Sequence, residues 1–342
     1  MSARRLVLAP EAAATTGLGH FVRCCALGDA AARRGWDVTV VLRPDAVDWS
    51  RAEVASRGWT LASGELDPEG LSGVLRRGGR PGEAVLVIDS YLVDETCFSE
   101  MRGRVGRLIV VDDVADRYLD ADIVVNQNVG GDTLPTRLGS GTVLLAGPAY
   151  ALLRPEFPAR RQAALDAIDA LPDVPGDILV MMGGTDPTGS APAVARACLT
   201  AFPQASVGVV VPGHARTRTV GRLTELPRLQ RVAQRMLEAD LVVTAAGSTI
   251  WELSCLARPI AALEMASNQS DVYRRLVADN LVLGLGRPPI DEAELVTALR
   301  SLTAAPGELR RLATVAARLV DGRGADRVLD CTDRTTPLGA QR

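Results

Sequence analysis

The stretch from Arg5 to Gly35, RLVLAPEAAATTGLGHFVRCCALGDAAARRG, decides the fold of the first part of the chain. Its start, Arg5-Leu6-Val7-Leu8, is typical of a short buried strand. After the turn Gly17-Leu18-Gly19-His20, apolar residues recur at helical spacing, and Gly35 stands just past their end. The stretch therefore predicts a strand, a glycine turn and an α-helix of about four turns over residues 20–34.

The turn at Gly17–His20 combines two chemical properties. A helix start leaves backbone N–H groups free at a positive dipole end, which suits a phosphate or a developing anion. His20, one of only two histidines in the chain, adds a group that exchanges a proton near neutral pH. Two interpretations stay open: the glycines only make the turn and His20 caps it, or Gly19 and His20 belong to a site.

Composition limits the classes of function. The 342 residues are enough for about two domains, each with its own core, and 47% hydrophobic content is typical of globular chains. A net charge of −3 disfavours nucleic acid or an anionic membrane as a partner. All 38 basic residues are arginines, which excludes a Schiff-base or P-loop lysine and leaves arginine or backbone groups to bind anions.

Cysteine spacing and hydropathy indicate the compartment. The six cysteines form no CxxC pair, so reduced thiols are expected. The apolar segment before Glu11 is too short for a signal peptide, and no apolar run approaches the roughly 20 residues that span a bilayer. We expect a soluble, cytoplasmic protein with no membrane span and no nucleic-acid partner.

Short apolar strands alternate with helical segments along the first half of the chain. Besides the first strand, they are predicted at residues 37–42, 84–88, 107–111, 123–125 and 142–145. Polar residues follow several of them, at Asp89-Ser90, Asp112-Asp113 and Asn126-Gln127-Asn128. Continuous apolar strands between helices predict a parallel sheet covered on both faces, with ligands at the carboxyl ends of its strands.

A second series of strands begins after residue 175. It is predicted at residues 177–182, 206–211, 241–244, 260–263 and 281–285, and consecutive helices follow over 291–330. A proline-bounded segment, 156–175, is the expected linker between a first domain, 1–155, and a second, 176–342. The predicted fold class is therefore α/β, with two Rossmann-like domains facing across a cleft that holds the active site.

Two turns of the second half are candidate anion sites. Met182-Gly183-Gly184-Thr185-Asp186-Pro187 follows a strand and is either a binding loop or a plain turn in which Thr185 or Asp186 caps the next helix. Gly247-Ser248-Thr249 also stands between a strand and a helix. Glu252 has two interpretations: a capping box with Thr249 as N-cap, or a hydrogen-bond acceptor for a ribose.

Metal and serine-hydrolase chemistry find little support. Asp112 and Asp113 are adjacent strand residues, which normally point to opposite faces. The two histidines and the cysteines show no metal-ligand spacing, and His214 is expected in a surface loop. Ser90 and Ser248 lack a G-x-S-x-G elbow. No metal and no cofactor are expected.

Several motifs together resemble one family. In chain order they are Gly17-Leu18-Gly19-His20 with Arg23-Cys24, Asp89-Ser90-Tyr91, Val111-Asp112-Asp113, Asn126-Gln127-Asn128, Gly147 to Phe157 (GPAYALLRPEF), Gly183 to Pro187 (GGTDP), Ala246 to Glu252 (AGSTIWE) and Asn268-Gln269. The set resembles the UDP-2,4-diacetamido-2,4,6-trideoxy-β-L-altropyranose hydrolases of pseudaminic acid biosynthesis and their spore-coat-polysaccharide relatives, which have the glycosyltransferase-B (GT-B) fold. The resemblance covers residues 17 to about 270.

The resemblance implies metal-independent hydrolysis of a UDP-sugar at its anomeric carbon, with inversion. It assigns water activation to His20 and the sugar and water site to Tyr91 and Asn268. It gives the diphosphate to Gly247, Ser248 and Thr249, the ribose to Glu252, and the uracil to the backbone near Met236. Within the same motifs we expect Gly184 to contact the nucleotide, and Gly19, Asp89 and Gln269 to contact the substrate.

This chemistry needs a neutral imidazole and an orienting group. An imidazole is a suitable base at neutral pH, and a nucleoside diphosphate leaves without a strong general acid. A backbone carbonyl or Asp89 would orient the ring. The main expectation is a hydrolase of a UDP-(acetamido/amino)deoxysugar, with that UDP-sugar as partner. The alternatives are a GT-B glycosyltransferase that uses a UDP-sugar donor, and a sugar-nucleotide-binding protein without turnover.

Overall fold

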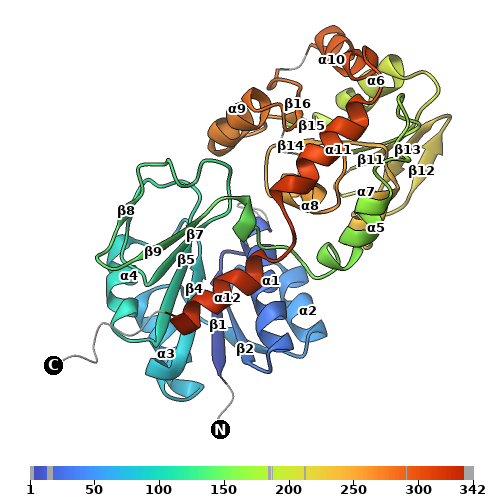
Figure 1. Cartoon of the computed structure of the whole chain (residues 1–342). Helices are drawn as coiled ribbons and strands as arrows, with labels where there is room; N and C mark the ends of the chain where they lie inside the picture. The colour runs from blue at the N-terminus through green and yellow to red at the C-terminus, as the bar shows by residue number, and fades with distance from the viewer. Residues whose placement is uncertain are drawn as a thin grey trace. The chain divides into compact units, whose positions relative to one another are not determined.

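The computed structural model describes residues 4–13, 18–183, 186, 188–211, 213–289 and 291–334. The chain forms two compact units (Figure 1). The first comprises Met1–Pro155 together with Arg323–Arg342, and the second comprises Glu156–Gly322. Each unit is built around its own seven-stranded sheet.

The sheet of the first unit is parallel, in the order β3-β2-β1-β4-β5-β7-β9. Its strands are β1 (Arg5–Pro10), β2 (Asp37–Leu42), β3 (Thr60–Ser63), β4 (Ala84–Asp89), β5 (Arg107–Val111), β7 (Ile123–Asn126) and β9 (Val143–Ala146). The strand order reverses between β1 and β4, which is the switch point where doubly wound sheets bind ligands.

Helices cover both faces of this sheet because successive strand residues point to opposite sides. Leu6 and Leu8 of β1 pack in one cluster with residues of α1 and α12, and Val7 and Ala9 pack in the other with residues of α3 and α4. The elements on the two faces and in the connections are α1 (Gly19–Arg33), α2 (Asp48–Ser56), α3 (Pro68–Arg77), η1 (Pro81–Glu83), α4 (Glu95–Arg102), β6 (Tyr118–Leu119), β8 (Arg137–Leu138), η2 (Pro148–Tyr150) and α12 (Gly324–Arg334).

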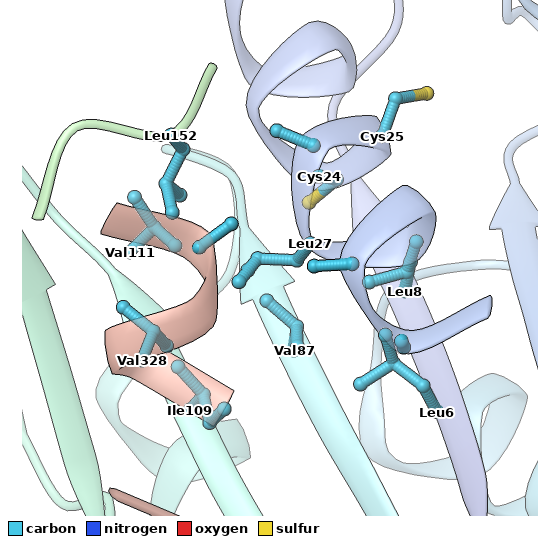
Figure 2. Close-up of a cluster of buried hydrophobic side chains, with 14 of the residues drawn as sticks. Leu6, Leu8, Cys24, Cys25, Leu27, Val87, Ile109, Val111, Leu152 and Val328 are labelled. Carbon is cyan, nitrogen blue, oxygen red and sulfur yellow. The ribbon is translucent and has the colours of Figure 1, made fainter. Parts of the chain in front are cut away.

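Helix α12 belongs to the first unit, although it follows the whole second unit in sequence. It packs against α1 (Figure 1), and Figure 2 shows Val328 in the same apolar cluster as Ile109, Val111 and Leu27. Arg34 joins the end of α1 to α12 through an ion pair with Asp330, 2.8 Å. The predicted C-terminal boundary of the domain 176–342 is therefore wrong. A helical pattern in this part of the sequence does not indicate which of the two sheets its apolar face packs against.

The sheet of the second unit has the order β12-β13-β11-β10-β14-β15-β16; its six parallel strands follow the order of the first six strands of the first sheet, and β12 is added at one edge. All neighbours are parallel except the edge pair β12–β13. The strands are β10 (Asp177–Met181), β11 (Ser206–Val210), β12 (Arg218–Val220), β13 (Leu223–Leu226), β14 (Leu241–Ala245), β15 (Ile260–Leu263) and β16 (Leu283–Gly284). The order reverses between β10 and β14, which is the second switch point.

Two helices of the second unit, η3 (Pro158–Arg160) and α5 (Arg161–Asp166), lie within the predicted linker. The other helices of this unit are α6 (Ala191–Ala201), α7 (Val232–Glu238), α8 (Thr249–Cys255), η4 (Ser267–Gln269), α9 (Ser270–Ala278), α10 (Glu292–Arg300), η5 (Ser301–Thr303) and α11 (Glu308–Leu319). Residues 156–175 thus contain η3 and α5 and are part of the second unit rather than a separate linker. Arg161 donates to the carbonyl oxygens of Cys255 and Ala317, which attaches α5 to α8 and α11.

The predicted buried strands are confirmed, most of them to within one residue at each end. The short strands β3, β12 and β13 were not predicted, because none carries a continuous apolar run; the residues of β3 and β12 are largely exposed and those of β13 are half-buried. Within the described part of the chain, no helix combines the length and the apolar character needed to cross a bilayer.

Candidate functional site

His20 and Asp89 meet at the switch point of the first unit. His20 is the second residue of α1, which follows β1, and Asp89 is the last residue of β4. Strands β1 and β4 are paired in register up to Pro10 and Asp89. The helix start and the strand end therefore bring an imidazole and a carboxylate to the carboxyl edge of the sheet, as polar residues after buried strands predict.

A short hydrogen bond joins the two side chains. His20 Nδ1 lies 2.6 Å from Asp89 Oδ1, and both side chains are buried. Because a carboxylate accepts in this contact, Nδ1 is the nitrogen that carries the proton when the ring is neutral, and Nε2 then has the lone pair. Of the two groups considered for orienting the ring, the structure has Asp89. Leu18 occupies the N-cap of α1 without a side-chain bond, so His20 does not act as the cap.

Arg23 holds Asp89 from the other side. It lies three residues after His20 and therefore on the same face of α1. Its Nε donates to Asp89 Oδ2 at 3.0 Å and its Nη2 to Asp89 Oδ1 at 2.8 Å, a bidentate arrangement that fixes the carboxylate plane. Its Nη1 donates to Asp113 Oδ2 at 2.7 Å. One buried guanidinium thus pairs with two carboxylates.

Asp113 connects this group to Tyr91. The Tyr91 hydroxyl donates to Asp113 Oδ1 at 2.5 Å, and the Tyr91 ring meets the imidazole edge-on, with ring centroids 4.6 Å apart. Tyr91 is 39% exposed, so it forms the outer wall of the site, beside His20. The predicted site residues His20, Asp89 and Tyr91 are therefore brought together, and Gly19 precedes them with open space around its Cβ position.

The charges around His20 act on its pKa in opposite directions. Burial favours the neutral ring, but the charge and hydrogen bond of Asp89 outweigh it, so the pKa of His20 is raised above its usual value. Arg23 lowers that pKa and Asp113 raises it. Burial acts to raise the pKa of Asp113, yet Arg23 and the Tyr91 hydroxyl hold it below its usual value. Burial and Asp113 raise the pKa of Tyr91, so the phenol stays protonated.

Two charged residues, the buried Glu11 and the partly buried Arg117, fix the loop that carries Tyr91. Glu11 Oε2 accepts from the Ser90 hydroxyl at 3.1 Å and from the Tyr91 amide at 3.0 Å. Arg117 donates to the carbonyl oxygens of Ser90 and Val93, 2.9 and 2.7 Å, and pairs with Asp112. Glu11 thus accepts hydrogen bonds from this loop and Arg117 donates hydrogen bonds to its carbonyl oxygens. These charged hydrogen bonds hold Tyr91 in place relative to His20.

The turn after β14 in the second unit offers two free backbone donors. Among the described residues, the amides of Ser248 and Thr249 have no acceptor, while those of Gly247 and Ile250 donate within the turn. Gln269 lies beside the turn, with its Nε2 3.6 Å from the position of a Cβ on Gly247. Helix α8 has seven residues, so the unpaired amides, rather than a long helix dipole, are what this turn offers to an anion.

The remaining predicted residues of the second unit are placed as follows. Ser248, not Thr249, is the N-cap of α8 and makes no side-chain cap bond, so the capping box is absent and that interpretation of Glu252 is wrong. Asn268 is exposed in η4. The side chain of Met236 is fully buried, which leaves only its backbone to face a base. Gly184 lies outside the described residues, as do Gly17, Thr185 and Pro187.

The Asp112–Asp113 pair is not a chelating pair. Asp112 accepts from the Ala115 amide at 2.8 Å and pairs with Arg117, whereas Asp113 faces Arg23 and Tyr91. Among the described residues, no group of three or more His, Cys, Asp or Glu side chains has an arrangement that could hold a metal ion. His214 is exposed near Glu225, and Asp186 caps α6 by accepting from the amides of Ser190 and Ala191.

Sequence reasoning did not assign roles to three residues of this site. Arg23 carried a signal, because i,i+3 spacing places it beside His20 on one helix face. Asp113 and Glu11 each follow a buried strand, a position that marks the ligand edge of the sheet. Which partner each selects depends on side-chain geometry between strands, which a single sequence does not encode at this detail.

Comparison with known proteins gives a fold and one distant relative. No protein-family model matches the chain. An uncharacterized protein of Methanocaldococcus jannaschii is 24% identical over 206 residues, which are 55% of this chain and 42% of the relative. The chain thus matches less than half of that relative's length.

Solved structures match over nearly the whole chain. MurG of Acinetobacter baumannii superposes with a TM-score of 0.67 at 12% identity, covering 98% of this chain and all of MurG. UGT89C1 of Arabidopsis thaliana in complex with UDP gives 0.65 at 13% identity, covering 96% and 99%. The spinosyn forosaminyltransferase SpnP gives 0.64 at 12% identity, covering 97% and 100%. With two α/β units, each built on its own doubly wound sheet, the chain has the GT-B fold.

Proposed function

We propose that this chain is a UDP-sugar-dependent enzyme in which His20 takes a proton from a hydroxyl, amine or water nucleophile that attacks the anomeric carbon. The observation that carries the proposal is the His20–Asp89 pair at a sheet switch point. With Nδ1–H donated to Asp89, the Nε2 lone pair is free to accept the proton, and Asp89 stabilises the imidazolium that forms.

The second unit supplies the leaving-group site in this proposal. As the anomeric C–O bond breaks, its electron pair goes to the β-phosphate oxygen of UDP, and the new negative charge needs hydrogen-bond donors. The free amides of Ser248 and Thr249 are such donors. We assign Glu252 to the ribose and the backbone at Met236 and Gly184 to the nucleotide, with Asn268 and Gln269 toward the sugar.

Glycosyl transfer to an acceptor is the form of this reaction that the comparisons favour. Neighbours by fold include a spinosyn forosaminyltransferase, and UGT89C1 has been crystallised with UDP and with UDP-L-rhamnose. In this form the nucleophile is an acceptor hydroxyl or amine, and His20 takes its proton while UDP departs. The exposed ring of Tyr91 would be the wall against which the sugar or acceptor lies.

Hydrolysis of a UDP-(acetamido/amino)deoxysugar is the second candidate. The observation that favours it is the ordered set of motifs from Gly17 to Gln269, which resembles hydrolases of UDP-diacetamido sugars. The proposed chemistry is unchanged, except that water stands where the acceptor would, and the products are UDP and the free sugar with inverted configuration.

One experiment separates the two candidates. UDP-, GDP-, dTDP- and CMP-sugars are incubated with the protein in ¹⁸O-water, with and without a panel of sugar and small-molecule acceptors. Rapid UDP release without acceptor, with ¹⁸O in the free sugar, supports hydrolysis; release only with an acceptor supports transfer. Label in UDP would mean P–O cleavage and would overturn both.

His20→Ala tests the base directly. Turnover should fall by about 10²-fold or more, because general-base catalysis contributes on that order. His214→Ala is the matched control, since His214 is exposed, and it should leave turnover near that of the parent protein. Equal turnover in His20→Ala and the parent would remove His20 from the mechanism.

A further inference from the structure

The nitrogen His20 Nδ1 has two neighbours that require opposite protonation states of this nitrogen. Asp89 Oδ1 at 2.6 Å needs a proton on Nδ1, whereas Arg23 Nη2 at 2.9 Å would donate to a bare Nδ1. A neutral imidazole satisfies only one of them. Arg23 Nη2 already donates to Asp89 Oδ1 at 2.8 Å, and the shorter, charge-assisted contact of Nδ1 is with the carboxylate.

Charge balance gives Arg23 a second effect. Two carboxylates, Asp89 and Asp113, stand close to His20, and Arg23 is the cation between them. Removing it would leave two uncompensated negative charges beside the imidazole, which favour the imidazolium. An imidazolium cannot accept a proton, so a site with the same dyad but without Arg23 would lose its base at neutral pH.

We infer that Arg23 is a positioning residue that holds the Asp89 carboxylate aimed at His20 Nδ1, and that Arg23 and Asp113 together set the pH above which His20 Nε2 accepts a proton. The groups that face the imidazole are Arg23 from α1, Asp89 from β4, Tyr91 from the loop after β4 and Asp113 from the loop after β5. The inference deepens the proposed function, on which only its kinetic part rests.

Three substitutions distinguish charge from geometry. Arg23→Gln removes the cation and should raise the titration midpoint of His20 by about one pH unit or more. Asp113→Asn removes a carboxylate and should move the midpoint the opposite way. Arg23→Lys keeps the charge but loses the bidentate fork, so its midpoint should stay near that of the parent while the rate above the midpoint falls several-fold.

The titration is read by NMR of the whole protein without substrate. The chain has two histidines, so ¹⁵N-labelled protein gives two sets of ring signals, which His20→Gln assigns. The ¹⁵N shifts also show which ring nitrogen carries the proton. His214 is the internal reference, because it is exposed and belongs to the second unit, whereas the three substitutions are made in the first.

Each outcome decides the inference. Opposite shifts in Arg23→Gln and Asp113→Asn, with protonated Nδ1 in the parent, support it. An unmoved His20 midpoint in both, or a bare Nδ1 in the parent, overturns it. If Arg23→Gln fails to fold, Asp113→Asn still tests the sign of the shift, and Arg23→Lys still tests the geometry. If the shifts occur but no nucleotide sugar is turned over, the proposed function fails and the role of Arg23 stands.

Discussion

The chemistry of this protein at the residue scale depends on the immediate surroundings of one imidazole. His20 is buried with a carboxylate, a guanidinium and a phenol ring in contact. These neighbours are bonded to one another and to Asp113, so the imidazole keeps one orientation, and its Nε2 has no partner among the described residues. The Nε2 atom is the group that the arrangement leaves for chemistry.

The raised pKa of His20 predicts the acid limb of the pH–rate profile. A base must be unprotonated, so the rate should rise with pH through the pKa of His20 and then level off. Because Asp89 outweighs burial and raises that pKa, the midpoint should lie above about 6.5, the ordinary value for histidine. The profile of kcat/KM between pH 5 and 9 measures it, and a midpoint below the ordinary value would contradict the charge balance described here.

Asp89→Asn should cost more than its size suggests. The amide keeps the shape, but its NH₂ group can donate to Nδ1, which would place the proton on Nε2 and remove the base. We expect kcat to fall on the order of 10²–10⁴-fold with a smaller change in KM. Asp94→Asn is a suitable control, because Asp94 only caps α4. A drop in kcat no larger than that of the control would argue against the dyad.

The sequence predicted the members of this site better than their bonds. His20 and Asp89 were recognisable because each stands at the end of a strand or the start of a helix, where a parallel sheet exposes its ligand edge, whereas Tyr91 was assigned only through the family resemblance. The pairing of Tyr91 with Asp113 and of Arg23 with two carboxylates was not predictable. It depends on rotamers across three strands, and several acceptors stand within reach of each donor.

At the scale of elements, the strands were predictable, but the surface against which the last helix packs was not. Buried parallel strands carry runs such as VVL or LIVV, which a short window identifies. Helix α12 carries an equally clear amphipathic pattern, but a pattern states only that one face is buried. Its partner, α1, lies about 300 residues earlier, and no local signal names it.

Close packing at the start of α12 gives a test of this placement. A Cβ on Gly324 would stand 2.2 Å from the carbonyl oxygen of Ala151, a contact that backbone cannot relieve cheaply. Gly324→Ala should therefore destabilise the first unit by about 1–3 kcal/mol. Denaturant unfolding followed by circular dichroism measures the change.

Gly73→Ala is the matched control for that substitution. Gly73 also lies in a helix, α3, and its added Cβ meets only Arg77 Nη1, at 3.5 Å. Alanine has the higher helix propensity, so this variant should be as stable as the parent or up to about 1 kcal/mol more stable. Equal destabilisation by both substitutions would refute the packing of α12 against Ala151.

At the scale of the whole molecule, two units with separate cores share one chain. The first core includes residues of α1 and α12, and the second includes residues of α6, α10 and α11. Each unit has a switch point with polar or unpaired groups at its strand ends. In our proposal the first unit provides the base and the second unit provides the nucleotide site, each at the carboxyl edge of its own sheet.

Binding of UDP alone should stabilise the second unit selectively. A ligand that binds only the native state adds RT ln(1 + [L]/Kd), about 2.7 kcal/mol at a hundredfold excess over Kd. Hydrogen exchange read by mass spectrometry should show protection in peptides covering 241–255, with little change in those covering β1 to β3. Glu252→Ala should lower the apparent affinity for UDP by about tenfold, so that about ten times more UDP is needed for the same protection. Protection confined to the first unit would contradict the assignment of the nucleotide site.

The return of α12 to the first unit has a consequence for how the protein is made. Residues Glu156–Gly322 form a continuous segment, so the second unit can fold while synthesis is still under way. The first unit begins earlier but lacks part of the apolar cover of α1, including Val328 and Leu329, until α12 has left the ribosome. The apolar cover of the helix that carries His20 is thus completed only after the second unit has been made. Ribosome-bound chains halted before residue 324 should therefore contain a folded second unit and a first unit that is not fully folded.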